Sequence, residues 1–292
     1  MVVVQRFGAS LVLVLFFAVP AVCKERLQIE VDRSFDEVTR AVENAGLEPV
    51  LGIDHARLAA AEGVDMPPSR VQLFSDARLN SKILMENIRA GLDLPFRVLA
   101  YEQDGETVVS YTSSAFLARR HDLKDASALS QFDTHLDEVF TTATTASPVT
   151  VPVKDIETDF AVIELKSKYD VPMTVARLKE AVMAQSDTIW FGEIDFQRSA
   201  SQEGVSLVPA QLLLFGGPAP GGVAMAQYPA IGLDAFCQKL LVYEGDDGKA
   251  ILLFNDRPFT CRAKTVLNRS SLLLFTVTCI RIISRFVTRA AR

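Results

Sequence analysis

The sequence predicts an α+β protein built from two similar domains, each a mostly antiparallel sheet covered by helices. The first observation is a repeated hairpin, because "FRVLAYEQDGETVVSYT" (96–112) is echoed by "KLLVYEGDDGKAILLFND" (239–256). Both stretches have an apolar strand ending in Tyr-Glu, an acidic turn with glycine and a second apolar strand. The second observation is that short apolar strands alternate with amphipathic helices, which is typical of α+β domains. The length of 292 residues also suits two domains better than one.

The repeat extends well beyond the hairpin, in one order and at a nearly constant offset. The strands "LEPVLGID" and "DTIWFGEID" both end in Ile-Asp, at Asp54 and Asp195. Next, Glu-Gly-Val recurs at 62–64 and 203–205, and Leu-Phe recurs at 73–74 and 214–215. Ordered matches of this kind indicate a tandem duplication. Each copy is expected to run strand, helix, strand, short helix, strand, long loop, hairpin, helix.

The helix that opens each copy is predicted from its apolar spacing. In "RSFDEVTRAVENAG" (33–46) the apolar residues recur at helical intervals. Ser34 is placed as the N-cap, and Glu37 three residues later completes a capping box. The counterpart in the second copy is "KYDVPMTVARLKEAV" (168–182).

The two ends and the linker set the expected boundaries. Residues 1–23 are predicted to be a signal peptide, because Arg6 precedes an apolar run from 11 to 22 and small residues follow. As a helix this segment reaches only about 25 Å, against roughly 30 Å of hydrocarbon. We therefore expect export, periplasmic or secreted, with an N-terminal membrane anchor as the alternative. The first repeat domain is then 24–146, the linker is 147–157 within a Thr/Pro-rich stretch, and the second repeat domain is 158–292.

The charge is distributed unevenly along the chain. The net charge is -6, and all acidic residues lie at or before Asp256. The first 256 residues carry 22 basic and 36 acidic side chains, a balance of -14, which excludes non-specific binding to nucleic acid. A basic stripe on a predicted C-terminal helix comprises Arg281, Arg285, Arg289 and Arg292. This helix is expected to pack inward with a solvated basic face, and the alternative is peripheral contact with a membrane or an acidic partner.

Cysteine usage shows no metal-site spacing. After cleavage near Cys23, the remaining cysteines are Cys237, Cys261 and Cys279, and no two of them form a C-x-x-C pair. One disulfide and three buried thiols are both compatible with the sequence.

The ordered motifs resemble a family catalogued as domain of unknown function 302. Copy one supplies the following matches: Ile53-Asp54, Leu94-Pro95, Tyr101-Glu102, Tyr111-Thr112 and "LARRH" at 117–121. Copy two supplies "FGGP" at 215–218, Tyr243-Glu244 and Asn255-Asp256. The resemblance covers about 27–143 and about 159 to the end. It implies an α+β sandwich that often dimerises and has no settled activity, so the two copies are expected to pack as an internal pseudo-dimer in a chain that is itself monomeric.

The candidate site residues fall into two groups, those that recur in both copies and those that occur in one. The carboxylates that recur in both copies, Asp54 with Asp195 and Glu102 with Glu244, are expected to cap helices or turns, since a residue needed by the fold should appear twice. The histidines His55, His121 and His135 occur only in copy one. The candidate ligand-binding set is Asp54, His55, Glu102, Tyr111, Arg119 and His121. No nucleophile motif or metal motif identifies catalytic residues, and no metal or other cofactor is predicted.

These observations predict a non-catalytic, exported module that binds a small molecule or a protein. The alternative is a metal- or haem-binding protein or a redox enzyme with its site in the first repeat, where the three histidines lie. The glycine-rich stretch "FGGPAPGG" (215–222) lacks a phosphate-binding lysine and is expected to be a loop.

Overall fold

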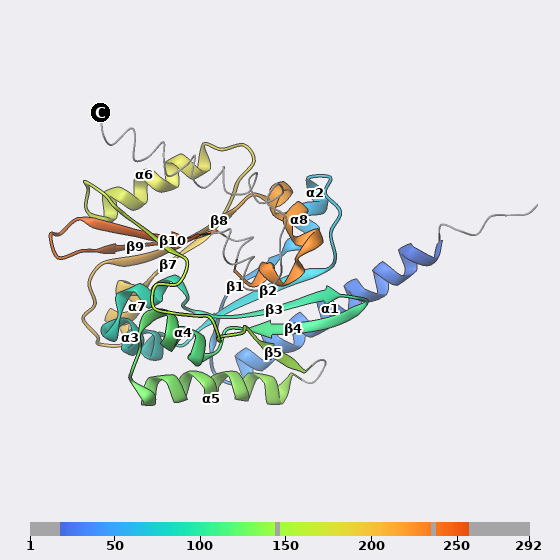
Figure 1. The fold of residues 1–292 in the computed structure, drawn as a ribbon, viewed down its shortest axis with the longest axis horizontal. Helices are drawn as coiled ribbons and strands as arrows, with labels where there is room; N and C mark the ends of the chain where they lie inside the picture. The colour runs from blue at the N-terminus through green and yellow to red at the C-terminus, as the bar shows by residue number, and fades with distance from the viewer. Residues whose placement is uncertain (1–17, 144–146, 235–237, 257–292) are drawn as a thin grey trace, which may run out of the picture.

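The computed structural model describes residues 18–143, 147–234 and 238–256 of the chain. It shows a mixed α+β protein with eight α-helices and two five-stranded sheets among these residues (Figure 1). The signal-peptide core, the three cysteines of the second half and the basic stripe Arg281, Arg285, Arg289 and Arg292 lie outside the described residues. Within the described ranges, no helix combines the length and the apolar character needed to cross a bilayer.

The first repeat begins with a long helix, and its sheet is built from hairpin-like neighbours. Its elements are α1 (Ala18–Asn44), β1 (Glu48–Asp54), α2 (His55–Ala61), β2 (Ser69–Ser75), α3 (Ala77–Glu86), the 3-10 helix η1 (Ile88–Leu92), β3 (Phe96–Gln103), β4 (Glu106–Tyr111), α4 (Ser114–His121) and α5 (Ala126–Thr142).

The second repeat follows a short linker strand, and from its first helix to its hairpin it has the same order of elements as the first repeat. The elements are β5 (Pro148–Thr150) in the linker, then β6 (Val162–Lys166), α6 (Val171–Met183), β7 (Ile189–Asp195), α7 (Phe196–Gln202), β8 (Ala210–Gly216), α8 (Pro218–Gln227), the 3-10 helix η2 (Pro229–Leu233), β9 (Gln238–Glu244) and β10 (Ala250–Asn255).

The two sheets have matching strand orders, which confirms the duplicated α+β architecture. The first sheet is β1-β2-β3-β4-β5, and the second is β7-β8-β9-β10-β6. The first four strands of each are antiparallel neighbours. Strands β1 and β7 even share a bulge, between Pro49 and Leu51 and between Trp190 and Gly192.

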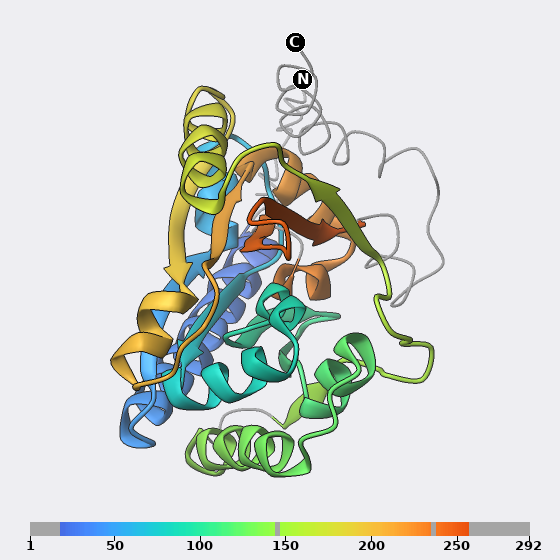
Figure 2. The same cartoon turned by 90° about the vertical axis from the view of Figure 1, so that its left-hand side faces the viewer.

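The repeats pack against each other with approximate twofold symmetry. Helix α2 contacts α8, and α3 contacts α7 in the reciprocal position. Likewise η2 contacts β2, β3 and β4, while η1 contacts β8, β9 and β10. Figures 1 and 2 show the two sheets brought together with the short helices between them. This reciprocity is the expected internal pseudo-dimer.

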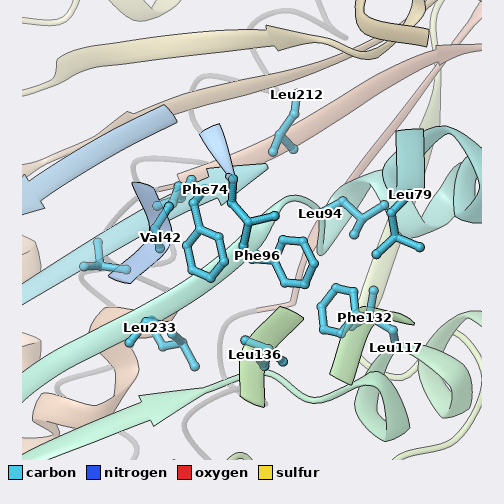
Figure 3. Packing of buried hydrophobic residues seen from close by; sticks show 14 of the residues in the cluster. Val42, Phe74, Leu79, Leu94, Phe96, Leu117, Phe132, Leu136, Leu212 and Leu233 are labelled. Atoms are coloured by element: carbon cyan, nitrogen blue, oxygen red, sulfur yellow. The ribbon is translucent and has the colours of Figure 1, made fainter. Parts of the chain in front are cut away.

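One hydrophobic core runs through both repeats. Phe74, Phe96 and Phe132 stack at its centre, with ring centroids 5.0 Å and 4.2 Å apart. Leu212 and Leu233 of the second repeat belong to the same cluster (Figure 3). Apolar area buried in this shared core stabilises both repeats. A second, smaller cluster lies within the second repeat alone, where α6 packs on its sheet.

The expected N-terminus of the first helix was wrong. Helix α1 is unbroken from Ala18 to Asn44, so Ser34 is no N-cap but a buried residue inside the helix. The apolar face continues upstream, with Leu27 one turn before Val31 and both of them buried. A helix that can bury one more turn has no reason to end at Ser34. The strand expected before this helix is therefore absent from the described part of the first repeat.

The linker supplies the missing edge strand instead. In the second sheet, β6 pairs antiparallel with β10. In the first sheet, the corresponding edge is taken by β5, which pairs parallel with β4 over three residues. The boundary expected to be a plain linker thus contributes a short strand, and it ties the end of the first repeat to the start of the second.

The glycine-rich stretch at 215–222 is not a loop, as the sequence had suggested. It ends β8 and then begins α8 at Pro218, a residue well suited to the first position of a helix. A Cβ at Gly222 would lie 2.6 Å from the Cβ of Ala59. The glycine therefore lets α8 approach α2 closely, which serves the contact between repeats.

Candidate functional site

A buried carboxylate, Asp93, stands where the two repeats meet. It follows η1, and its side chain is 2% exposed. Arg120 Nη1 donates to both of its oxygens, at 3.0 and 2.8 Å, and Lys239 Nζ donates from the second repeat at 3.0 Å. His121 Nε2 lies 2.7 Å from Oδ2, and Arg97 Nη2 lies 3.3 Å from Oδ1. Four side chains from both repeats thus converge on one acid.

The second repeat carries a counterpart, Asp234, after η2. It accepts hydrogen bonds from Arg97 Nη1 at 2.5 Å and from Asn255 Nδ2 at 2.6 Å, and it pairs with Lys239. Arg97 and Lys239 occupy the same position in β3 and β9, so each repeat sends one basic side chain to both acids. We call this set the inter-repeat charge cluster: Asp93, Arg97, Arg120, His121, Asp234 and Lys239.

Mutual compensation keeps the cluster charged although it is buried. Burial alone raises the pKa of Asp93, but the charges of Arg120 and Lys239 outweigh it and hold this pKa well below its usual range. Burial also acts to raise the pKa of Asp234, which the charges of Lys239 and Arg97 lower overall. Both carboxylates are therefore ionised at neutral pH. Burial lowers the pKa of Lys239, mainly because desolvation disfavours the ammonium form.

In the Asp93–His121 pair, the histidine is buried and neutral. Burial lowers the pKa of His121, so its ring is neutral at pH 7. Since a carboxylate only accepts, Nε2 carries the proton, and Nδ1 is buried with no hydrogen-bond partner in the described part of the chain. The side chain is 1% exposed. A histidine in this state orients its neighbours, and it offers no accessible base.

Beside the cluster lies a cavity of about 60 Å³, which we call the inter-repeat cavity. The aromatic rings of Phe116 and Phe160 line it, as do Ile231 and Leu233 of η2. Its wall therefore combines α4 of the first repeat, the segment before β6 and a helix of the second repeat. Concave, mostly apolar spaces with a few polar groups are the usual form of small-molecule sites.

A difference between the repeats explains why this space is open. In η1, Arg89 forms ion pairs with Asp159 at 2.7 Å and with Glu164 at 2.5 Å, and its Nη1 lies 3.4 Å from the Tyr243 hydroxyl. At the corresponding position of η2 the chain has Ala230, which lines the cavity. A methyl group cannot occupy the volume that a guanidinium fills in the other repeat.

His55 makes a different contact across the interface. Its Nε2 donates to the carbonyl oxygen of Gly232 at 3.0 Å, and burial lowers its pKa to about 3. A Cβ on Gly232 would lie 3.2 Å from the His55 ring, and one on Gly91 would lie 3.1 Å from Phe196. His55 and Phe196 are therefore paired positions, each resting on the glycine of the opposite repeat.

Three of the four repeated carboxylates, those of Asp54, Asp195 and Glu102, cap a helix or close a turn. Asp54 and Asp195 are N-caps, and each accepts a backbone N–H at 2.9 Å, from Arg57 and Arg198 respectively. Asp54 also pairs with the side chain of Arg57 on the surface. The Glu102 carboxylate accepts the N–H of Gly105 at 2.8 Å and so closes the hairpin turn.

The remaining predicted site residues are spread over the first repeat. Tyr111 packs on Phe140, with ring centroids 4.6 Å apart, and burial raises its pKa. Arg119 is exposed on α4, whereas its neighbour Arg120 is buried in the cluster. Of the six residues in the predicted set, His121 alone belongs to the charge cluster, and none is among the described residues lining the cavity.

Sequence reasoning missed Arg120, and it also missed Asp93, Arg97, Asp234 and Lys239. A signal for the last four was present in the repeat itself. Gly-Leu-Asp occurs before the hairpin in both copies, at 91–93 and 232–234, and a basic residue stands four positions before each Tyr-Glu. A charge kept in both copies inside an apolar strand points to a buried partner across the interface.

The histidines do not converge on one another. His55 faces Gly232, His121 faces Asp93, and His135 lies 2.9 Å from Asp76. Among the residues that the structure describes, no group of three potential ligands could hold a metal ion.

The family model for "Domain of unknown function DUF302" matches residues 24–142 and again 163–265. The chain belongs to this family and contains two copies of its domain. A solved structure with a similar fold is an uncharacterized conserved DUF302 protein from Bacillus stearothermophilus. It shares 13% identity, with a TM-score of 0.37, over 42% of this chain and 94% of that one.

Curated relatives include two proteins described as fluoride-specific ion channels. One is FluC 1 of Brucella suis biovar 1 (strain 1330), 32% identical over 95 residues, which are 32% of this chain and 37% of that protein. The other is FluC 1 of Brucella abortus biovar 1 (strain 9-941), also 32% identical over 95 residues, 35% of its length. The match thus spans about a third of these relatives.

Proposed function

We propose that this chain is a non-catalytic binding module that holds a small, largely apolar molecule in the inter-repeat cavity. The observation that carries the proposal is the cavity itself, which is walled by both repeats and by the segment joining them. Its volume of about 60 Å³ corresponds to four to six water-sized spaces, at roughly 10–15 Å³ each. An engineered apolar cavity that holds benzene has about 150 Å³, so this smaller cavity has room for a molecule of about two to four non-hydrogen atoms.

The non-catalytic part of the proposal is supported by the state of the charged groups. In the inter-repeat charge cluster, Asp93 is bound by four donors, and His121 does not line the cavity. General acid–base catalysis needs a group within hydrogen-bond reach of the substrate. A molecule in the cavity would meet apolar walls and compensated charges.

The alternative of a metal, haem or redox site in the first repeat has one supporting observation, the short His121–Asp93 contact of 2.7 Å. Such pairs orient metal-binding histidines in many proteins. Against it, the other two histidines are engaged elsewhere. A metal analysis and a visible spectrum of the purified full chain would revive this alternative if they showed a stoichiometric metal or a haem band.

Export is a further part of the proposal and is supported by the apolar run that follows Arg6. The basic residues Arg281, Arg285, Arg289 and Arg292 support a second location, at an anionic membrane surface, for the exported chain. The fluoride conduction of the curated relatives is not part of our proposal, because the match covers about a third of their length. Sequencing the N-terminus of the protein from the producing cell tests export, and an intact Met1 would contradict it.

Filling the cavity tests the binding function. Ethane under pressure serves as the probe, and Ala230→Leu places three more carbons at the cavity wall. We expect ethane to raise the melting temperature of the wild type, by mass action, and to bind Ala230→Leu at least about tenfold more weakly. The matched control is Ala60→Leu, which adds the same atoms on the exposed face of α2 and should bind like the wild type. Equal ethane binding by both variants would place the ligand elsewhere.

A further inference from the structure

The polar part of the cavity wall specifies more than an apolar ligand. Four polar side chains line the cavity: Asp93, Thr112, Arg120 and Asp234. What a ligand can bind there depends on which of these groups has a hydrogen bond left to give or to accept.

Arg120 has no donor left for an anion. Its Nε donates to the carbonyl of Phe160 at 3.0 Å, and Nη1 donates to both oxygens of Asp93. Nη2 donates to Asn255 Oδ1 at 2.6 Å and lies 3.4 Å from the carbonyl of Ala161. All five N–H groups are engaged. A carboxylate or phosphate entering the cavity would have to break one of these bonds.

Asp234 is different, because it can still accept. Its Oδ1 receives Arg97 and Lys239, but Oδ2 receives Asn255 Nδ2 alone among the described residues. A carboxylate oxygen has two acceptor sites, and this side chain is 23% exposed, compared with 2% for Asp93. The cavity wall thus presents a hydrogen-bond acceptor, which fits a ligand that carries a hydrogen-bond donor.

The balance of charge excludes a cation as the best donor. Three cations, Arg97, Arg120 and Lys239, surround two carboxylates, so the inter-repeat charge cluster already carries an excess of one positive charge. A further cation would be desolvated beside them, and only two acids would compensate for four positive groups. A neutral donor obtains the hydrogen bond without that repulsion.

We propose that the inter-repeat cavity selects an uncharged molecule with a small apolar body and one hydroxyl group, which donates to Oδ2 of Asp234. This inference rests on the proposed binding function and assigns the chemical class of its ligand. Thr112, on the same wall, can serve the acceptor side of the hydroxyl. Small aliphatic alcohols have this chemistry.

Four probes that share one body and differ in the head group test the class. They are ethanol, ethylamine, acetate and ethane, the last as a gas under pressure, added to the full chain at pH 7 and followed by NMR shifts at the cavity residues. We expect ethanol to bind about 3- to 10-fold more tightly than ethane, which is the size of one neutral hydrogen bond. It should bind at least about tenfold more tightly than either ion.

The variant Asp234→Asn sharpens the test by removing one negative charge at nearly constant shape. The preference between the two ions should shift toward acetate by about tenfold, since the local excess of positive charge grows. Asp195→Asn is the matched control, because this change lies at the N-cap of α7 and keeps a capping side chain. It should leave all four affinities unchanged. The melting temperature of each variant shows whether it has folded.

The possible failures are distinguishable. If acetate or ethylamine binds the wild type more tightly than ethanol, the ligand class is overturned while the binding function stands. An unchanged ion preference in folded Asp234→Asn would also overturn the assigned role of that carboxylate. If none of the four probes binds the wild type, or Phe116→Ala with its enlarged cavity, the binding function itself is overturned.

Discussion

The two repeats place equivalent elements around their shared interface, yet they fill it differently. At equivalent positions, the first repeat has Arg89, which forms ion pairs with Asp159 and Glu164, and the second has Ala230, which leaves a cavity. Where the first repeat has His55 bonded to a carbonyl, the second has the apolar Phe196. The two repeats thus share one framework, and they differ by single residues at paired positions. These differences fill the space beside η1 and leave the inter-repeat cavity beside η2.

The acids Asp93 and Asp234 offer the strongest test of this comparison. Asp93→Asn leaves three cations and a histidine around a neutral amide in a site that is 2% exposed. Breaking a buried ion pair from one side typically costs about 3–5 kcal/mol of unfolding free energy. Asp234→Asn should cost less, about 1–2 kcal/mol, because its side chain is 23% exposed and water can compensate.

Chemical denaturation of both variants at pH 7 measures the difference. Equal losses of unfolding free energy would show that the difference in burial between the two acids has no energetic consequence. A larger loss at Asp234 would contradict the expected order. A loss below about 1 kcal/mol at Asp93 would remove the charge cluster as a stabilising link between the repeats.

The framework could be predicted from sequence because it is written twice. Matching motifs such as the Ile-Asp strand ends at Asp54 and Asp195 gave the duplication, the α+β class and the capping role of these acids. The start of α1 was not predictable from local signals, since the capping box at Ser34 is favourable alone but yields to burial of Leu27 and Val31.

The site was harder to predict for a physical reason. The predicted set contains the exposed Arg119 and not the buried Arg120. The two side chains are chemically identical, and only the orientation of α4 separates them. The partners of Asp93 include Lys239, 146 residues away, and no local pattern reports which long-range pairs meet. The cavity is harder still to predict from sequence, since it depends on the small size of the Ala230 side chain.

The pair His55 and Phe196 gives a pH-dependent test of intermediate size. Burial lowers the pKa of His55 to about 3, whereas in the unfolded chain it is about 6.5. Between these values the unfolded state binds more protons, so stability falls as the pH falls from about 6.5 toward 3. The loss due to this one group is about 2 kcal/mol between pH 7 and pH 5.

His55→Phe gives the first repeat the residue of the second and removes this titration. Its stability at pH 7 should be about 1–3 kcal/mol below the wild type, because the Gly232 carbonyl loses its donor. The gap to the wild type should then narrow by about 2 kcal/mol at pH 5. The reciprocal change, Phe196→His, should add a similar dependence to the second repeat. Denaturation curves of the three proteins at the two pH values decide the matter, and parallel losses on acidification would rule out a buried neutral His55.

The smallest expected effect concerns Asp54 and Asp195, and it separates scaffold from site. Each caps a helix through one hydrogen bond of 2.9 Å, so Asp54→Ala and Asp195→Ala should each cost about 1 kcal/mol. Asp54 also pairs with Arg57, which is 56% exposed, and such surface pairs add at most about 0.5 kcal/mol. Urea denaturation should therefore give nearly equal losses, and Asp54→Asn should restore most of the stability because asparagine caps as well as aspartate. Neither change should alter binding of ethanol, since neither residue lines the cavity. If Asp54→Ala weakens that binding and Asp195→Ala does not, the first repeat uses this carboxylate for more than its helix, and the ligand site must extend from the interface to the outer end of β1.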